Sequence, residues 1–230
     1  LKAASDKLGD KVAYEVLDLR SKNLKSLVEK LMFAYKPTAL VNNAAANFLC
    51  PSLNLSFNGY QSIIETVMQG SFMLTQAFGE YWLSQGCPGK VVSISAFYGD
   101  GAGPYVAASA MAKAAIESMT KSLAVEGGRH NIRLNAIAPG YVKTEGAWKR
   151  LLPPSIDEHQ FLSSVPLSRL AEPKEIAQAV VFTMLNQYIT GQILTIDGGV
   201  QLASGAGFFS TAPSTLTEQD WEEMRAQAKR

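Results

Sequence analysis

The chain has 230 residues, of which 47% are hydrophobic and 18% are charged, and its formal net charge is +1. This composition can fill a substantial core, and the near-neutral charge argues against a nucleic-acid binder, which needs a surplus of cations. No apolar run approaches the roughly 18 residues of a membrane span, and two cysteines and two histidines argue against a disulfide scaffold or a zinc site.

Apolar runs and helical periodicities alternate along the chain. Residues 1–11 are typical of the end of a helix and a turn, so we expect that residues upstream, including a first βαβ unit, are missing. Strands are predicted at 11–19, 38–45, 90–96, 131–140 and 192–199, and helices at 21–35, 57–84, 105–127 and 172–185.

The order of these elements predicts the fold class. Strands that are continuous apolar runs, separated by helices of ten or more residues, indicate a parallel sheet covered on both faces. We therefore expect a single doubly wound, Rossmann-like α/β domain over residues 1–230. An irregular, proline-containing region at about 141–168 follows a strand end and is interpreted as a lid over the ligand crevice. Thr217 and Asp220 form a capping-box pattern, which predicts a tail helix at about 217–228.

Small and polar residues follow three of the predicted strands. They are Asn42, Asn43 and Asn47 after the first, Ser93, Ser95 and Tyr98 at the second, and Pro139, Gly140 and Thr144 at the third. The next helix adds Ser109 and Lys113 in the sequence SAMAK. Because ligands of open α/β sheets bind outside the carboxyl ends of the strands, these residues are candidates for a site.

These motifs resemble the short-chain dehydrogenase/reductases. The turn NNAA, the serine-bearing strand, the helix with Lys113, NAIAPG and IDGG fall in that family's order, from about Lys11 to Gly199. The common family pattern places a tyrosine four residues before the lysine, where the ammonium lowers the pKa of the phenol. Here that position is Ser109, and Gln69 stands where the family has a polar asparagine.

Tyr98, fifteen residues before Lys113, offers another arrangement. It is similar to that of the mitochondrial 2,4-dienoyl-CoA reductases, in which the tyrosine lies on this loop, serine takes the usual tyrosine position and asparagine follows the NNAA turn. The peroxisomal enzymes of this type share the Asn-Phe turn seen at Asn47 and Phe48 but carry an aspartate elsewhere. The resemblance therefore implies reduction of 2,4-dienoyl-CoA to 3-enoyl-CoA in fatty acid β-oxidation, with NADPH as cofactor.

The resemblance also implies roles for individual residues. Tyr98 and Asn47 would hold the thioester carbonyl and stabilise a dienolate, Lys113 would hold the nicotinamide ribose, and Ser109 would support them. The implied cofactor contacts are Asp18, Asn43, Ala44, Ser93, Lys113, Pro139, Gly140, Val142 and Thr144. The implied substrate contacts are Asn47, Phe48, Tyr98, Ser109 and the basic residues Lys143, Lys149 and Arg150, which suit the phosphates of CoA.

Plainer interpretations stand beside these roles. Tyr98 can be a loop tyrosine, Asn47 a turn residue with positive φ, and Lys113 a solvated charge. Tyr105 is one residue too far from Lys113 for the spacing of enoyl-ACP reductases. At the level of the protein, the alternatives are another short-chain reductase of acyl thioesters or carbonyls, and a non-catalytic NAD(P)-binding subunit.

The setting of the protein is also an expectation. The resemblance implies a homotetramer, which suits the small residues of the helix at 105–127, and no nucleic-acid or membrane partner. The mitochondrial matrix is the expected location, with the peroxisome as the alternative, although the C-terminal AQAKR is not a peroxisomal signal.

Overall fold

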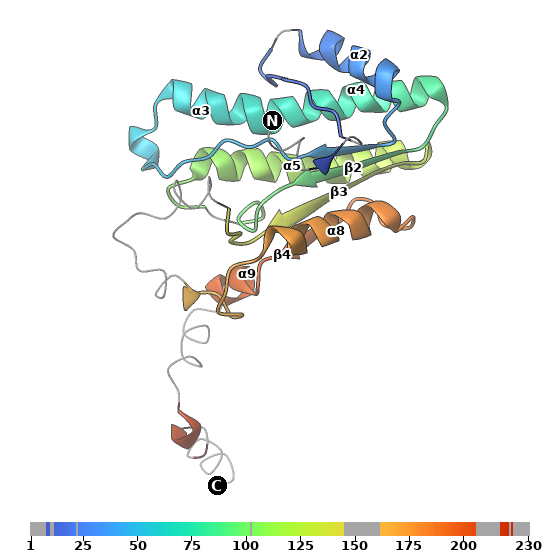
Figure 1. The fold of residues 1–230 in the computed structure, drawn as a ribbon. Coiled ribbons are helices and arrows are strands. Elements are labelled where there is room, and N and C mark those ends of the chain that lie inside the picture. The colour runs from blue at the N-terminus through green and yellow to red at the C-terminus, as the bar shows by residue number, and fades with distance from the viewer. Residues whose placement is uncertain are drawn as a thin grey trace.

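The computed structural model describes residues 8–9, 12–21, 23–101, 103–144, 162–205, 217–220 and 222. Its centre is a parallel sheet of four strands in the order β1-β2-β3-β4 (Figure 1). The strands are β1 (Ala39–Asn42), β2 (Gly89–Ile94), β3 (Ile132–Pro139) and β4 (Ile193–Ile196). The helical elements are α2 (Leu24–Tyr35), η1 (Ser52–Asn54), α3 (Phe57–Ile63), η2 (Ile64–Gln69), α4 (Gly70–Gln85), α5 (Ala107–Gly128), α8 (Pro173–Leu185) and α9 (Val200–Gly205).

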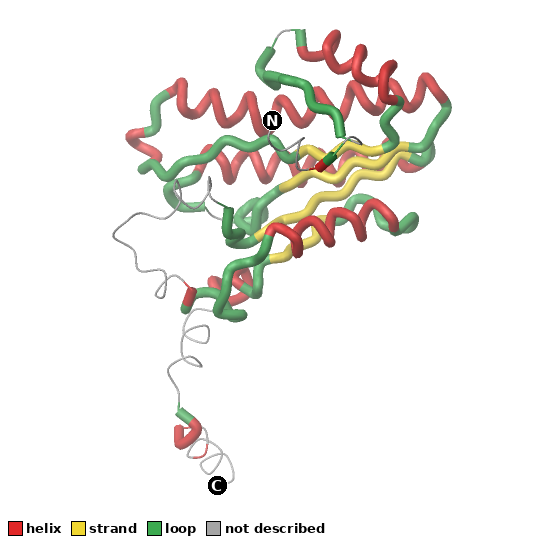
Figure 2. The backbone as a smooth tube through the Cα atoms, viewed as in Figure 1, coloured by secondary structure: helices red, strands yellow, loops and turns green. Residues whose placement is uncertain are grey.

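Helices cover both faces of the sheet, as the continuous apolar strands predicted (Figure 2). Successive side chains of a strand point to opposite faces, so Val91 packs beneath α4 and α5, whereas Val92 packs against α8. Helix α2 forms an outer layer on α4 through Leu24, Val28 and Met32. The predicted doubly wound α/β fold is confirmed.

Trp82 joins the helical layer to the sheet. Its side chain is fully buried, its ring packs on Phe78, and its Nε1 donates a hydrogen bond to Pro37 O (2.7 Å). A Cβ on Gly89, the first residue of β2, would collide with the Trp82 ring. The end of α4 and the start of β2 are thereby held in one relative position, which aligns β2 with the site at its other end.

One predicted strand is wrong. Residues 12–18 form a loop instead of the strand expected at 11–19. A strand is stable only beside a neighbour that completes its hydrogen-bond ladder, and this segment pairs with no strand among the described residues. Leu17 and Leu19 instead pack their side chains against α2 and α4.

The long helix predicted at 57–84 is continuous but not uniform. It runs as α3, the π-helical turn η2 and α4, and it ends at Gly86, whose φ is +61°. Apolar periodicity does not reveal the π turn, because six residues are too few to establish a different period. Val67 in this turn is buried against the small residues Ala108 and Ala112 of α5.

Candidate active site

The carboxyl ends of the strands meet at one edge of the sheet. Asn42 is in register with Ser93, and Ile94 with Ile137, so β1, β2 and β3 end side by side. Gly140 follows β3, where its N–H donates to Ile196 O (2.9 Å) and a Cβ would lie 2.6 Å from the Cα of Asp197. The predicted polar residues of three strand ends therefore lie along one edge of the sheet.

Tyr98 is the centre of a hydrogen-bonded cluster at this edge. Asn47 Nδ2 donates to Tyr98 Oη (3.2 Å), and the same phenol oxygen lies 3.2 Å from Ser109 Oγ. Three chain segments, the loop after β1, the loop after β2 and the first turn of α5, supply these groups. The structure thus brings together three of the four residues expected to be catalytic.

The backbone conformation excludes one of the plainer interpretations, that of Asn47. Asn47 is not among the described residues with positive φ, so it is not a left-handed turn residue. Its Oδ1 atom is buried and has no hydrogen-bond partner among the described residues. Burial raises the pKa of the half-buried Tyr98 phenol, and the hydrogen bond with Ser109 lowers it. Tyr98 therefore stays protonated near neutral pH and can donate a hydrogen bond.

Lys113 is a buried cation, not a solvated one. Only 6% of its surface is exposed, and its Nζ donates to Ile94 O at the end of β2 (2.5 Å). Burial lowers its pKa to about 8. An ammonium carries three N–H donors, and this is the one hydrogen bond of Lys113 within the described part of the chain. Two N–H donors of the ammonium are not used in that hydrogen bond.

Ser93 lies near the carboxyl end of β2. It is buried, and its Oγ accepts a hydrogen bond from Asn42 Nδ2 (3.2 Å), which also donates to Thr75 Oγ1 (2.9 Å). Asn42 Oδ1 is buried without a partner among the described residues. The network links β1, β2 and α4, and places Ser93 behind the residues that face a ligand.

The other expected cofactor residues line the rim of the sheet. Asn43 and Ala44 are exposed after β1, Pro139 is the buried last residue of β3, and Val142 forms an isolated parallel bridge with Ala171. Thr144 is exposed at the end of the described loop, where its N–H donates to Val142 O.

Asp18 differs from this group. It is exposed on the loop where a strand was expected, and it accepts hydrogen bonds from the backbone N–H, Nε and Nη2 of Arg20. These hydrogen bonds hold the pKa of Asp18 down to about 2. Both oxygens of its carboxylate are engaged by Arg20, so the structure does not place this residue with the candidate site.

The expected substrate residues are only partly described. Phe48, which is 38% exposed, lines a small hollow with Asn47, Leu55 and Ile63. Lys143 is exposed on the loop after β3, but Lys149 and Arg150 lie outside the described residues, as does most of the predicted lid. Of the tail helix, residues 218–220 and 222 are helical, and Thr217 and Asp220 form the predicted capping contacts.

Tyr105 and Gln69 are not members of the Tyr98 cluster. Tyr105 precedes α5 with a φ of +63° and an exposed ring, and its backbone oxygen accepts from the N–H of Cys50 (2.8 Å). Gln69 is exposed at the end of η2. Neither side chain makes a hydrogen bond to the Tyr98 cluster, although Tyr105 lines the small hollow that Asn47 also lines.

Sequence reasoning missed Glu117. This α5 residue is 5% exposed and accepts a hydrogen bond from Ser95 Oγ (2.6 Å), directly behind the loop that carries Tyr98. A signal was present, because Glu117 stands four residues after Lys113 and so shares its helix face.

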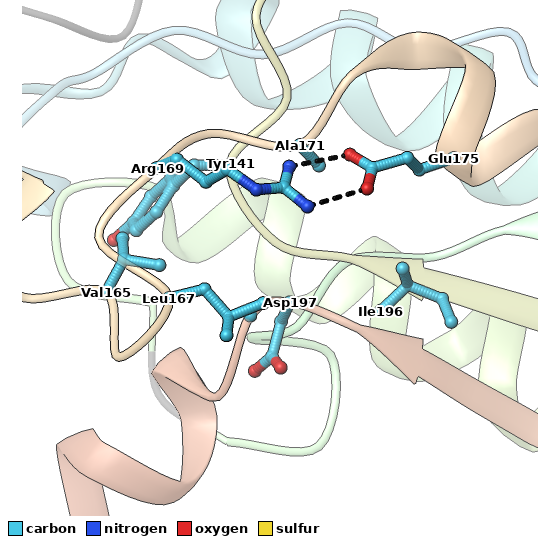
Figure 3. A pocket seen from close by; sticks show the side chains of 9 residues that line it. Tyr141, Val165, Leu167, Arg169, Ala171, Glu175, Ile196 and Asp197 are labelled. Atoms are coloured by element: carbon cyan, nitrogen blue, oxygen red, sulfur yellow. Dashed lines mark hydrogen bonds and ion pairs between the residues drawn. The ribbon is translucent and has the colours of Figure 1, made fainter.

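A second hollow lies beside β4 and contains no residue of the Tyr98 cluster (Figure 3). Arg169 makes a two-fold hydrogen-bonded ion pair with Glu175, at 2.7 and 2.8 Å. Asp197 accepts from the N–H groups of Gly199 and Gln201 at the start of α9. The charged groups that line this hollow are therefore satisfied within the protein, which agrees with a structural role for Arg169.

None of the helices in the described part of the chain is long and apolar enough to span a bilayer. No three His, Cys, Asp or Glu side chains gather there in a way that would hold a metal ion.

Known proteins resemble this chain in sequence and in fold. A family model described as Enoyl-(Acyl carrier protein) reductase matches residues 1–201. The chain is 39% identical over 193 residues to a Bacillus subtilis protein named "Probable 2,4-dienoyl-CoA reductase", of the (2E)-enoyl-CoA-producing type, covering 82% of this chain and 76% of that protein.

Two animal relatives carry names of the (3E)-enoyl-CoA-producing type. A Caenorhabditis elegans protein named "Probable 2,4-dienoyl-CoA reductase" is 33% identical, with 84% of this chain and 64% of that protein covered. The peroxisomal 2,4-dienoyl-CoA reductase of Danio rerio is 36% identical, with 72% and 55% covered. The chain thus spans less than two thirds of these two relatives.

Solved structures share the fold. A crystal structure of a short chain dehydrogenase from Bacillus anthracis is 39% identical, with a TM-score of 0.71 over 80% of this chain and 73% of that chain. The structure of ElxO with NADP bound is 26% identical, with a TM-score of 0.74 over 82% and 77%. By its parallel sheet, its family match and these relatives, the chain belongs to the short-chain dehydrogenase/reductase family of oxidoreductases.

Proposed function

We propose that the protein is an NADPH-dependent 2,4-dienoyl-CoA reductase that yields a 3-enoyl-CoA. One observation carries the proposal. The phenol oxygen of Tyr98 meets Asn47 Nδ2 and Ser109 Oγ at 3.2 Å each, in a site where serine takes the family's tyrosine position. Such a cluster suits a reaction that needs hydrogen bonds to an oxygen instead of full protonation of a ketone.

The residues at the crevice fit a nicotinamide cofactor. Lys113 is held by one hydrogen bond to Ile94 O and keeps two N–H donors, the chemistry that ribose hydroxyls accept. The backbone at Gly140 approaches Asp197, the residue after β4, so closely that no side chain fits between them. Asn43, Ala44, Pro139, Val142 and Thr144 would line the remainder. When bound, the reduced nicotinamide supplies the hydride that the diene takes up at C5.

Tyr98 and Asn47 would act on the thioester oxygen. Asn47 has two N–H donors and gives one to the Tyr98 oxygen, which can also accept a hydrogen from Ser109. The phenol hydrogen and the second amide hydrogen are then available to one oxyanion. As the diene is reduced at C5, its electrons move toward this oxygen, and two donors in a low-dielectric site stabilise the dienolate that forms.

The position of protonation sets the product. A proton delivered by water to C2 leaves the double bond between C3 and C4, a 3-enoyl-CoA, whereas a proton at C4 leaves it between C2 and C3. The groups described here gather at the thioester end and include no acid aimed farther along the chain, which favours C2. The Bacillus relative, with its (2E)-enoyl product, makes this assignment worth testing directly.

The surroundings suit an acyl thioester. The small hollow beside Asn47 is lined largely by apolar groups, among them Phe48, Leu55, Ile63 and Val106, which suits an apolar ligand near this residue. Lys143, with Lys149 and Arg150, would meet the CoA phosphates.

We place the protein in the mitochondrial matrix or, as its zebrafish relative is, in the peroxisome. The exposed Met111 and Val125 of α5 favour assembly of copies, as in the expected homotetramer.

The test is NADPH oxidation by the full-length protein with 2,4-hexadienoyl-CoA, beside 2-hexenoyl-CoA and acetoacetyl-CoA. We expect turnover with the diene alone and a 3-hexenoyl product by NMR. A 2-hexenoyl product would overturn the protonation site but keep the substrate. Turnover with a control substrate only would indicate another reductase, and NADPH binding without turnover would indicate a non-catalytic subunit.

A further inference from the structure

The segment that carries Tyr98 is short and lies between β3 and α5. It leaves β2 at Ser95 and turns back at Gly99, whose N–H donates to Ala96 O (2.8 Å). On one side, the N–H groups of Ser95 and Phe97 donate to the backbone of β3, at Ile137 O and Pro139 O. The other side of the segment faces α5, and there a single buried carboxylate meets it.

That carboxylate is Glu117. Its Oε1 accepts the hydrogen bond of Ser95 Oγ (2.6 Å), and both side chains are at least 95% buried. A Cβ on Gly99 would collide with the same oxygen and lie 2.8 Å from Ser95 Oγ. Glu117 thus touches both ends of the five-residue segment that has Tyr98 as its fourth member.

The helix links this contact to the other site residues. Ser109, Lys113 and Glu117 are spaced by four residues along α5, so they form one row facing the end of β2. Ser109 reaches Tyr98, Lys113 reaches Ile94 O, and Glu117 reaches Ser95. The first two have roles in the proposed chemistry, while Glu117 is behind the segment and away from the phenol.

We propose that Glu117 is a positioning residue, which clamps the Ser95–Gly99 segment to α5 and so fixes the Tyr98 phenol against Asn47 and Ser109. A buried carboxyl is costly, and it is retained where its hydrogen bond has a purpose. The acceptor oxygen, not the charge, makes the clamp, because the contact is a hydrogen bond from a hydroxyl. The catalytic part of this inference rests on the proposed function, which gives Tyr98 its role.

The first measurement needs no substrate. Hydrogen exchange of the amides in residues 95–101, followed by mass spectrometry of full-length protein, compares Glu117→Ala, Glu117→Gln and the exposed α5 control Glu126→Ala. We expect exchange about tenfold faster or more in Glu117→Ala, and wild-type exchange in the other two, because glutamine keeps the acceptor. Unchanged exchange in Glu117→Ala would overturn the clamp. If that variant does not fold, Ser95→Ala decides the point, because it removes the donor of the same hydrogen bond: fast exchange of this segment with normal exchange elsewhere supports the clamp, and unchanged exchange overturns it.

The second measurement connects the clamp to Tyr98. With whichever substrate the wild type reduces, Glu117→Ala is combined with Tyr98→Phe in a double-mutant cycle. We expect Glu117→Ala to lower kcat about tenfold alone but less than about twofold in the Tyr98→Phe background, and Glu117→Gln to restore the rate. Equal losses in both backgrounds would show that Glu117 acts only on the stability of the fold. Failure of the wild type to reduce dienoyl-CoA would reject the proposed function and leave the exchange result standing.

Discussion

The two hollows at the ends of the strands differ in how their polar groups are satisfied. Beside β4, Arg169 and Glu175 bind each other and Asp197 binds the backbone of α9. Around Tyr98, a buried amide oxygen of Asn47 has no partner among the described residues, and Lys113 keeps two donors. A buried polar group without a partner is costly, so it persists where a ligand completes it. The two places therefore differ in unused hydrogen-bonding capacity, and the proposed function places ligand binding where that capacity remains.

The largest effect should come from the Tyr98 phenol. Tyr98→Phe removes one hydrogen aimed at the thioester oxygen, and the loss of one such donor typically lowers kcat about 10² to 10³-fold. Stopped-flow rates with 2,4-hexadienoyl-CoA measure this. The same change at the exposed Tyr188 is the matched control and should leave kcat unaltered. A Tyr98→Phe enzyme with wild-type kcat would contradict the comparison.

Lys113 should show opposite effects on activity and on stability. Burial lowers its pKa from 10.5 to about 8, so keeping it charged costs the folded state about 3 kcal/mol at pH 7. This cost falls as pH rises from about 8 to 10.5, where the residue is neutral in the folded state but charged in the unfolded state.

Lys113→Met removes the cost and the two donors together. We expect a higher melting temperature at pH 7 by calorimetry, with kcat/KM for NADPH reduced about 100-fold, since hydrogen bonds to a charged group are strong. Lys174→Met, on the exposed side of α8, should change neither quantity. A lower melting temperature for Lys113→Met would mean that the ammonium stabilises the fold.

The same ammonium predicts an alkaline limit. Lys113 loses its proton as pH rises through about 8, so kcat/KM for NADPH should fall about tenfold per pH unit above that value. A pH profile from 6 to 10 tests this. In Lys113→Arg the alkaline decrease of kcat/KM should vanish, because a guanidinium keeps its charge in this pH range. If kcat/KM of the wild type decreased only near pH 10, Lys113 would be in contact with water.

The smallest effect should come from a substitution in the hollow beside β4. Arg169→Gln breaks an ion pair whose two side chains are about half and one third exposed, and exposed pairs contribute little to stability. We expect unchanged kcat and a melting temperature within about 2 °C of wild type, by calorimetry and steady-state assay. A loss of catalysis would show that the satisfied hollow also serves the site.

Much of the fold could be predicted from local pattern. The apolar runs at β1 to β4 and the helices that join them were found because burial on both faces leaves no polar alternation. The segment at 11–19 misled the prediction, since β propensity cannot show whether a partner strand lies beside it. The π turn and the short α9 were missed because neither changes the apolar period over enough residues.

The site was predicted less directly. Tyr98, Asn47 and Ser109 were grouped by family resemblance, and the structure brings them together through contacts that no sequence spacing defines. Glu117 was overlooked because a glutamate on a helix is most often solvated, and its burial depends on how closely Gly99 approaches α5.

The Asn47–Tyr98 hydrogen bond also has a consequence for folding order. Tyr98 and Ser109 are 11 residues apart, but Asn47 and Tyr98 are separated by 51, and a parallel sheet offers no hairpin to bring such segments together early. Long loops must close before these contacts form, which is slow. On refolding, helix α5 with Tyr98 and Ser109 can assemble first, and activity should return only when the loop after β1 docks. The recovery of turnover therefore reports the latest step of folding. Helix content measured by spectroscopy should recover earlier, before that step is complete.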